Sequence, residues 1–173
     1  MHKISKLTAI VPALNEAQTI SSVIEGLLQI ADQVILVDDG SSDESAGWAA
    51  SAGATVIKTS APGSGPAFAR NLAAGQATGD LLFFCDADVQ IRPGTLKHIQ
   101  RVFTADPDLS ALFGSYDDQP GDPGFLSQYR NLFHHYVHQN ASEEASTFWS
   151  GCGIIRRDAF LEQDRACLSR RFQ

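Results

Sequence analysis

The sequence predicts an α/β protein with a mostly parallel sheet flanked by helices. Short apolar runs of β-forming residues alternate along the chain with segments whose apolar residues recur at helical spacing, which is the pattern of a doubly wound sheet. Several of these runs are apolar on both faces, as expected for strands buried between two layers of helices. At 173 residues, 43% hydrophobic and 19% charged, the chain has the size and composition of one soluble globular domain.

In the first half of the chain, three short strands alternate with helices. Asn15 and Gln18 have the spacing of a capping box for the first helix, and Ser41 and Glu44 have the same spacing before the second helix. The expected elements are strand 7–11, a helix with apolar positions from 20 to 28, strand 34–37, a helix from 41 to 52, and strand 55–58.

The second half continues the alternation but ends in less regular elements. A Gly/Pro loop at 62–66 leads into a helix that has Pro66 in its first turn. The expected elements are helix 67–77, strand 81–85, a helix from 93, strand 110–116, a polar loop at 117–124, helix 125–139 with an apolar stripe, and a glycine-interrupted strand within 147–156 followed by a short helix.

The apolar strand 81–85 ends in two carboxylates, Asp86 and Asp88, with one small residue between them. Ligands collect at the carboxyl ends of parallel strands, and carboxylate oxygens suit a hard divalent cation. Taken alone, the pair also fits a turn or a helix cap. The other strands favour a site, because polar residues also follow strand 7–11 and strand 34–37, at the same predicted edge of the sheet.

The Gly/Pro loop is a weaker signal of anion binding. Its glycines would let the backbone approach a ligand, and Arg70, one turn into the following helix, would reach a phosphate or a base carbonyl. The loop lacks the Lys-Ser/Thr ending of a P-loop, and a flexible surface turn is the favoured interpretation of the loop taken alone.

Charge and cysteine content exclude some classes of protein. A net charge of −7 leaves no basic footprint for nucleic acid and makes a local cation more necessary if the ligand is an anion. The three widely spaced cysteines fit reduced thiols in the cytoplasm better than disulfides or a zinc site. Residues 1–6 lack the apolar stretch of a signal peptide, and no apolar run is long enough to span a bilayer.

Five motifs, in order, resemble family 2 glycosyltransferases. They are 11–16 (VPALNE), 37–43 (VDDGSSD), 69–71 (ARN), 77–80 (ATGD) and 86–88 (DAD). The resemblance covers 7–160 and implies a GT-A fold, a Rossmann-like domain of nucleotide-diphospho-sugar transferases. It also implies transfer of a sugar from a nucleotide-diphosphate donor, with a UDP-sugar favoured and a GDP-sugar as the other option.

The resemblance assigns roles to particular residues. It implies a nucleotide pocket lined by the set Pro12, Ala13, Asn15, Glu16, Asp39, Arg70 and Asp86. Asp39 would accept a hydrogen bond from the base, and Asp86 would contact the ribose or the metal. Asp86 and Asp88 would hold Mn²⁺ or Mg²⁺, which stabilises the leaving nucleoside diphosphate when bound. Trp149, Gly151 and Gly153 would line the acceptor side, although a strand with a bulge explains these glycines equally well.

Arg130, His134 and His138 fall at i, i+4 and i+8 of the last predicted helix, so they share one face. No further ligand stands at zinc-binding spacing. A polar face in solvent is the favoured interpretation. The alternative is a strip that meets an anionic acceptor, such as a lipid phosphate, in which case the protein would associate peripherally with the inner face of a membrane.

The chain departs from the family after 156–160 (RRDAF). The expected glycine-rich stretch and the later acidic motif that supplies the catalytic base are missing, and the only late carboxylates are Glu143, Glu144 and Glu162. We therefore expect residues 1–162 to form a nucleotide-sugar-binding domain incomplete at its C-terminus, with 163–173 an atypical tail. The expected function is a metal-assisted, inverting glycosyltransferase that turns over weakly in this form. The alternatives are a sugar-nucleotide-binding module without catalysis and a sugar-1-phosphate nucleotidyltransferase.

Overall fold

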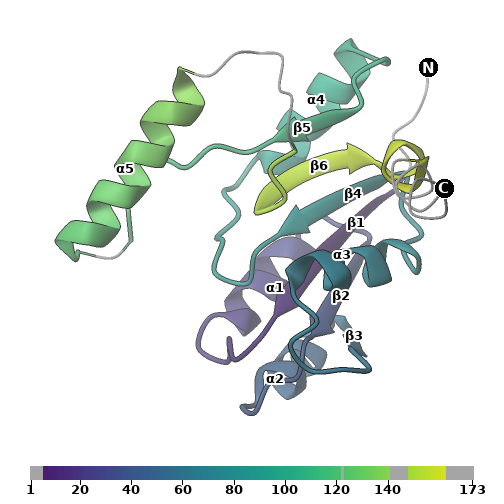
Figure 1. Cartoon of the computed structure of the whole chain (residues 1–173). Coiled ribbons are helices and arrows are strands. Elements are labelled where there is room, and N and C mark those ends of the chain that lie inside the picture. The colour runs from purple at the N-terminus through teal and green to yellow at the C-terminus, as the bar shows by residue number, and fades with distance from the viewer. Residues whose placement is uncertain (1–5, 122, 141–147, 163–173) are drawn as a thin grey trace, which may run out of the picture.

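Six strands form one sheet in the order β3-β2-β1-β4-β6-β5 (Figure 1). The computed structural model describes residues 6–121, 123–140 and 148–162. β1 pairs in parallel with β2 and β4, and β2 with β3, whereas β6 runs antiparallel to both β4 and β5. The predicted mostly parallel sheet is therefore confirmed. The strands are β1 (Leu7–Ala13), β2 (Gln33–Asp38), β3 (Thr55–Lys58), β4 (Leu81–Cys85), β5 (Ala111–Phe113) and β6 (Cys152–Arg156).

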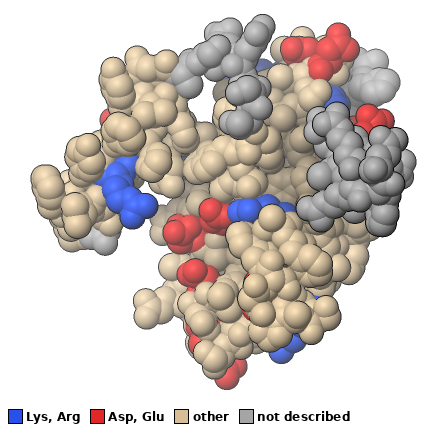
Figure 2. All heavy atoms as spheres, in the orientation of Figure 1, with Lys and Arg blue, Asp and Glu red and all other residues tan. Residues whose placement is uncertain are grey.

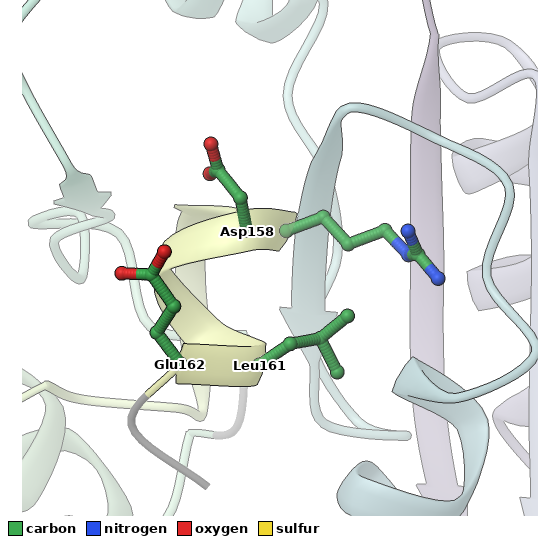
Figure 3. A pocket seen from close by; sticks show the side chains of 4 residues that line it. Asp158, Leu161 and Glu162 are labelled. Atoms are coloured by element: carbon green, nitrogen blue, oxygen red, sulfur yellow. The ribbon is translucent and has the colours of Figure 1, made fainter. Parts of the chain in front are cut away.

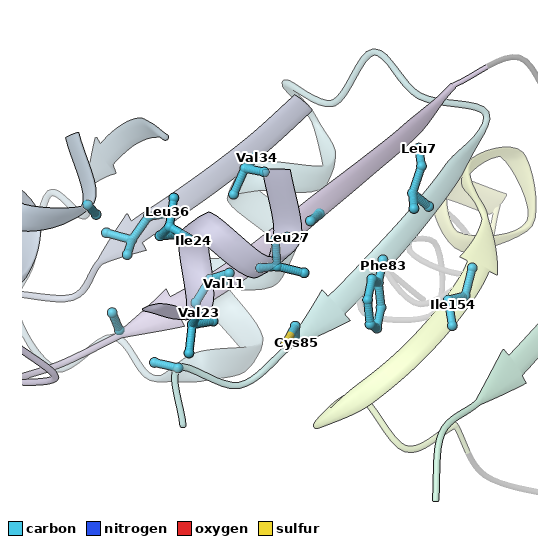
Figure 4. Close-up of a cluster of buried hydrophobic side chains, with 14 of the residues drawn as sticks. Leu7, Val11, Val23, Ile24, Leu27, Val34, Leu36, Phe83, Cys85 and Ile154 are labelled. Carbon is cyan, nitrogen blue, oxygen red and sulfur yellow. The ribbon is translucent and has the colours of Figure 1, made fainter. Parts of the chain in front are cut away.

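Apolar side chains cover both faces of the sheet, since successive residues of each strand point to opposite sides. In β4, Phe83 belongs to one apolar cluster and Phe84 to the other. The first cluster packs against α1 and α4 (Figure 4), and the second packs against the alanines of α3. The helices are α1 (Ile20–Leu28), α2 (Ser45–Ala52), α3 (Pro66–Ala74), α4 (Thr95–Ala105) and α5 (Phe125–Gln139).

The two predicted capping boxes are wrong. α1 and α2 follow Thr19 and Glu44, and neither residue caps its helix through its side chain. Asn15 has a φ of 59° and joins the two loops instead: its Oδ1 accepts from the Ser42 backbone N–H at 2.8 Å, and its own N–H donates to Ser41 Oγ at 2.9 Å. These contacts between the β1–α1 and β2–α2 loops use the side chains that the spacing had assigned to caps.

The last elements differ most from expectation. β5 is shorter than the predicted strand 110–116, whereas α5 has the predicted bounds. α5 stands away from the sheet (Figure 1), and no residue of it is buried. Among the described residues, no helix combines the length and apolarity needed to cross a bilayer. The predicted tail, 163–173, lies outside the described residues.

Candidate functional site

Asp39, directly after β2, holds the Gly/Pro loop against the carboxyl edge of the sheet. Its Oδ2 accepts from the Gly65 N–H at 2.7 Å, and its Oδ1 accepts from the Ser64 N–H at 3.0 Å and from Thr59 Oγ1 at 2.9 Å. The Gly65 N–H and these other donors hold the pKa of the Asp39 carboxyl below its ordinary value. The Asp39 carboxylate thus fixes the loop at this edge of the sheet. The sequence had predicted that this carboxylate accepts a hydrogen bond from the nucleobase.

Gly40 makes this arrangement possible. Its φ is +97°, and a Cβ placed there would lie 2.5 Å from the Cβ of Pro62. The turn after β2 and the start of the Gly/Pro loop therefore touch at a point that only glycine can occupy.

Arg70 and Asp86 join α3 to the end of β4. Arg70 Nη2 donates to Asp86 Oδ1 at 2.6 Å; the Arg70 side chain is 13% exposed and that of Asp86 is 45% exposed. Burial raises the pKa of Asp86, the Arg70 guanidinium opposes the rise, and Asp88 adds to it. The Arg70 guanidinium is thus held against the Asp86 carboxylate and away from solvent. Its buried Nε has no hydrogen-bond partner among the described residues.

Glu16, Asp86 and Asp88 form an acidic group at the ends of β1 and β4. Burial raises the pKa of Glu16, with further contributions from Asp88 and Asp86, so the three carboxylates lie within electrostatic reach of one another. Figure 2 shows acidic atoms gathered at the centre of this face, next to basic atoms. Within the described ranges, no three His, Cys, Asp or Glu side chains are arranged to hold a metal. A cation at Asp86 and Asp88 would need further oxygen ligands from water or from a bound molecule.

The predicted acceptor segment lies directly against Asp86. The Asp86 N–H donates to the Gly151 carbonyl at 2.9 Å, and a Cβ at Gly151 would lie 3.0 Å from both Asp86 Oδ2 and the Trp149 ring. At Gly153, a Cβ would lie 2.5 Å from the Trp149 carbonyl oxygen. β6 pairs with β4 residue for residue from Cys152 to Arg156, so the glycines mark close contacts and the alternative of a bulge is wrong.

His134 and His138 on α5 are half-buried and turned towards the molecule, so the predicted exposure of this face to solvent is wrong for them, whereas Arg130 is exposed as predicted. The Tyr116 ring stacks on His134 with 5.3 Å between centroids and lies 5.5 Å from the Trp149 ring. His138 meets Trp149 edge to face at 4.9 Å, and His135 Nδ1 donates to the Tyr116 carbonyl oxygen at 2.6 Å. Tyr116 thus connects α5 to the acceptor segment. Sequence reasoning missed it, because it has no partner at helical or strand spacing.

A separate hollow of about 200 Å³ is lined by Arg157, Asp158, Leu161 and Glu162 (Figure 3). It lies at the opposite edge of the sheet from Asp86, because Arg156 pairs with Leu81, the first residue of β4. The late carboxylate Glu162 is therefore not part of the acidic group. Glu143 and Glu144 lie outside the described residues.

A family model, "Glycosyl transferase family 2", matches residues 8–163. The chain belongs to this family. Solved relatives confirm the GT-A fold expected from the resemblance. Mannosyltransferase PcManGT from Pyrobaculum calidifontis, crystallised with GDP-Man and Mn²⁺, aligns with a TM-score of 0.63 and 25% identity over 91% of this chain and 46% of that chain.

Two curated relatives are glucosyl-3-phosphoglycerate synthases. The protein from Mycolicibacterium smegmatis is 37% identical over 95 residues, or 48% of this chain and 31% of that protein. The one from Mycobacterium tuberculosis is 35% identical over 95 residues, or 48% of this chain and 29% of that protein. A crystal structure of the M. tuberculosis enzyme with Mn²⁺ and UDP-Glc aligns with a TM-score of 0.63 at 21% identity, over 88% of this chain and 56% of that chain. The matched part thus spans about a third of the curated relatives.

Proposed function

We propose that this chain binds a nucleotide-diphospho-sugar at the carboxyl edge of its sheet, and that the protein transfers the sugar to an acceptor with inversion. The observation that carries the proposal is the convergence of Asp39, Arg70, Asp86 and Asp88 at one edge in a member of this family. In open α/β sheets this edge is where nucleotides bind. A UDP-sugar is the favoured donor and a GDP-sugar the alternative, because relatives were crystallised with both.

The nucleotide lies, in this proposal, along the ends of β1 and β2. Pro12 and Ala13 end β1, and Asn15 and Glu16 follow in a loop that Ser41 and Ser45 hold by hydrogen bonds to its backbone. Asp39 positions the Gly/Pro loop, whose backbone would face the base. Arg70 supplies a fixed positive charge next to the diphosphate.

Asp86 and Asp88 would hold Mn²⁺ or Mg²⁺ together with oxygens of the diphosphate. Three observations support this fit: Asp88 is exposed, Asp86 gives only Oδ1 to Arg70, and the charge of Asp88 adds to the raised pKa of Asp86, as a neighbouring negative charge does. A bound cation would relieve that repulsion and stabilise the negative charge that develops on the leaving diphosphate. The chain's own residues orient the donor, and Trp149, Gly151 and Gly153 would border the acceptor.

We also propose a cytoplasmic location, at the inner face of a membrane. Cys85 and Cys152 are free thiols, as a reducing compartment favours. The outer side of α5 supports membrane contact, because Phe125, Leu126 and Tyr136 are exposed there.

Calorimetric titration of UDP, GDP and their sugars into the 173-residue chain, with and without Mn²⁺, tests the donor site. We expect UDP to bind in the presence of Mn²⁺ and Asp88→Asn to weaken Mn²⁺-dependent binding at least tenfold. Asp158→Asn, on the opposite edge, is the matched control and should bind like the parent chain. Equal affinity with and without Mn²⁺, or equal affinity of the two variants, would contradict the metal assignment.

A further inference from the structure

We propose that Arg130, His134 and His138, along one face of α5, bind a phosphate group of the acceptor in the hollow between α5 and the carboxyl edge of the sheet. This inference rests on the proposed function and names the acceptor class: a molecule that carries a phosphomonoester beside the hydroxyl to be glycosylated. The phosphate would come from a small metabolite or from a lipid headgroup.

The orientation of α5 is the first evidence. Its apolar side chains are the exposed ones: Phe125 is 81% exposed and Tyr136 is 65% exposed. Its half-buried side chains are all polar and include the three imidazoles, and the rings of His134 and His138 pack on Tyr116 and Trp149. Arg130 is exposed, so its guanidinium is free to reach a ligand. A helix that turns polar side chains inward, next to the proposed donor site, is placed to bind a polar ligand there.

The position of this face relative to the acidic group is the second evidence. Burial raises the pKa of the Tyr116 phenol, Asp88 and Asp86 raise it further, and the Arg130 charge opposes them. Tyr116 is therefore within electrostatic reach of both Arg130 and the carboxylates. Figure 2 shows the basic side chain of α5 facing the acidic atoms across a hollow. An acceptor held on α5 would present its hydroxyl towards the donor at Asp86 and Asp88.

Charge is the third evidence. The chain carries a net charge of −7, yet residues 125–139 contain Arg130 and three histidines and no acidic residue. An acidic protein repels an anionic substrate over most of its surface, so a local basic strip is needed where that substrate binds. Arg130 gives a permanent charge and a planar set of donors suited to phosphate.

His138 supplies an unused polar atom. Its Nδ1 is buried and has no hydrogen-bond partner among the described residues. A buried polar atom of this kind is costly unless a ligand or water pairs with it. Burial lowers the pKa of His138, and His134 and His135 lower it further, so the neutral ring would pair with an anion through a ring N–H, while the permanent positive charge comes from Arg130.

Binding of phosphate probes to the 173-residue chain tests the inference without turnover. The probes are inorganic phosphate, 3-phosphoglycerate, and vesicles of phosphatidylcholine with and without phosphatidic acid, each measured with and without UDP and Mn²⁺. The test variant is Arg130→Gln/His134→Asn/His138→Asn. The matched control is Arg101→Gln/His98→Asn on α4, where the two side chains lie 3.0 Å apart and are exposed.

We expect at least one phosphate probe to bind and the α5 variant to weaken it tenfold or more, with the control and UDP binding unchanged. The probe that binds identifies the kind of molecule that carries the phosphate: 3-phosphoglycerate, which also has a free hydroxyl, indicates a metabolite, and phosphatidic acid, used as a probe of the phosphomonoester alone, indicates a lipid headgroup. Equal binding by the α5 variant and the parent chain, or no binding of any phosphate probe by the parent chain, would overturn the inference. If the parent chain does not bind UDP, the proposed function is overturned instead, so the two failures are distinguishable.

Discussion

Arg70 and Asp86 should be measurably coupled, because their ion pair is short and its arginine is largely shielded from water. The Nη2–Oδ1 distance is 2.6 Å and the Arg70 side chain is only 13% exposed. Hydrogen bonds between charged groups contribute about 1.5 to 3 kcal/mol. Since Asp86 is 45% exposed, solvent screening places this pair at the lower end, near 1.5 kcal/mol.

A double-mutant cycle with Arg70→Met and Asp86→Asn measures that coupling through the free energy of unfolding in urea. The chain offers a control pair, Arg92 and Asp117, whose side chains are 58% and 38% exposed. Its coupling should be about 0.5 kcal/mol, as for surface pairs. A coupling for Arg70 and Asp86 no larger than that of the control pair would refute the argument from burial.

Three further predictions concern stability. Because the pKa of Asp39 is lowered in the folded chain, its ionised carboxylate contributes fully to the free energy of unfolding above pH 3.8, the ordinary pKa, and this contribution is lost as the pH falls through the folded pKa. Asp39→Asn should therefore make the free energy of unfolding in urea less dependent on pH in the acid range. Gly79→Ala should destabilise the chain by about 1 to 3 kcal/mol, since its Cβ would lie 2.7 Å from a main-chain nitrogen of β1. Gly26→Ala, in open space within α1, should stabilise the chain by about 0.5 kcal/mol, and chemical denaturation compares the free energies of unfolding of the two variants. Phe84→Ala, fully buried, should lower the free energy of unfolding by about 3 to 5 kcal/mol and Phe68→Ala, 47% exposed, by under about 1 kcal/mol; similar thermal shifts for the two would contradict the core assignment.

The sheet could be predicted closely because burial imposes a simple pattern on its strands. β3 and β4 have the predicted bounds, and their apolar residues pack where alternation requires. The capping boxes were mispredicted because the spacing of polar residues along the chain does not show which hydrogen-bond partner each side chain has in the fold. Asn15 bonds to Ser42, a neighbour in space that is distant in sequence.

The site residues that directly follow a strand could be predicted from the sequence. The hydrogen-bond partners of their side chains could not. The positions of Asp86 and Asp88 follow from the end of β4. The hydrogen bond from the Gly65 N–H to the Asp39 carboxylate could not be inferred from the sequence. The Gly/Pro loop has no periodic pattern from which its path could be predicted. The orientation of α5 was missed for a related reason: its apolar stripe implied burial, and only the rings of Tyr116 and Trp149 show which side faces inward.

The bond from the Asp86 N–H to the Gly151 carbonyl closes a long excursion of the chain that contains α4, β5 and α5. Both ends of this excursion are fixed in the sheet, one by β4 and the other by β6. Insertions, deletions or exchanges between these two anchors would leave the carboxyl ends of β1, β2 and β4 where they are. This architecture would let the side proposed for the acceptor change its shape and polarity without moving the side proposed for the donor.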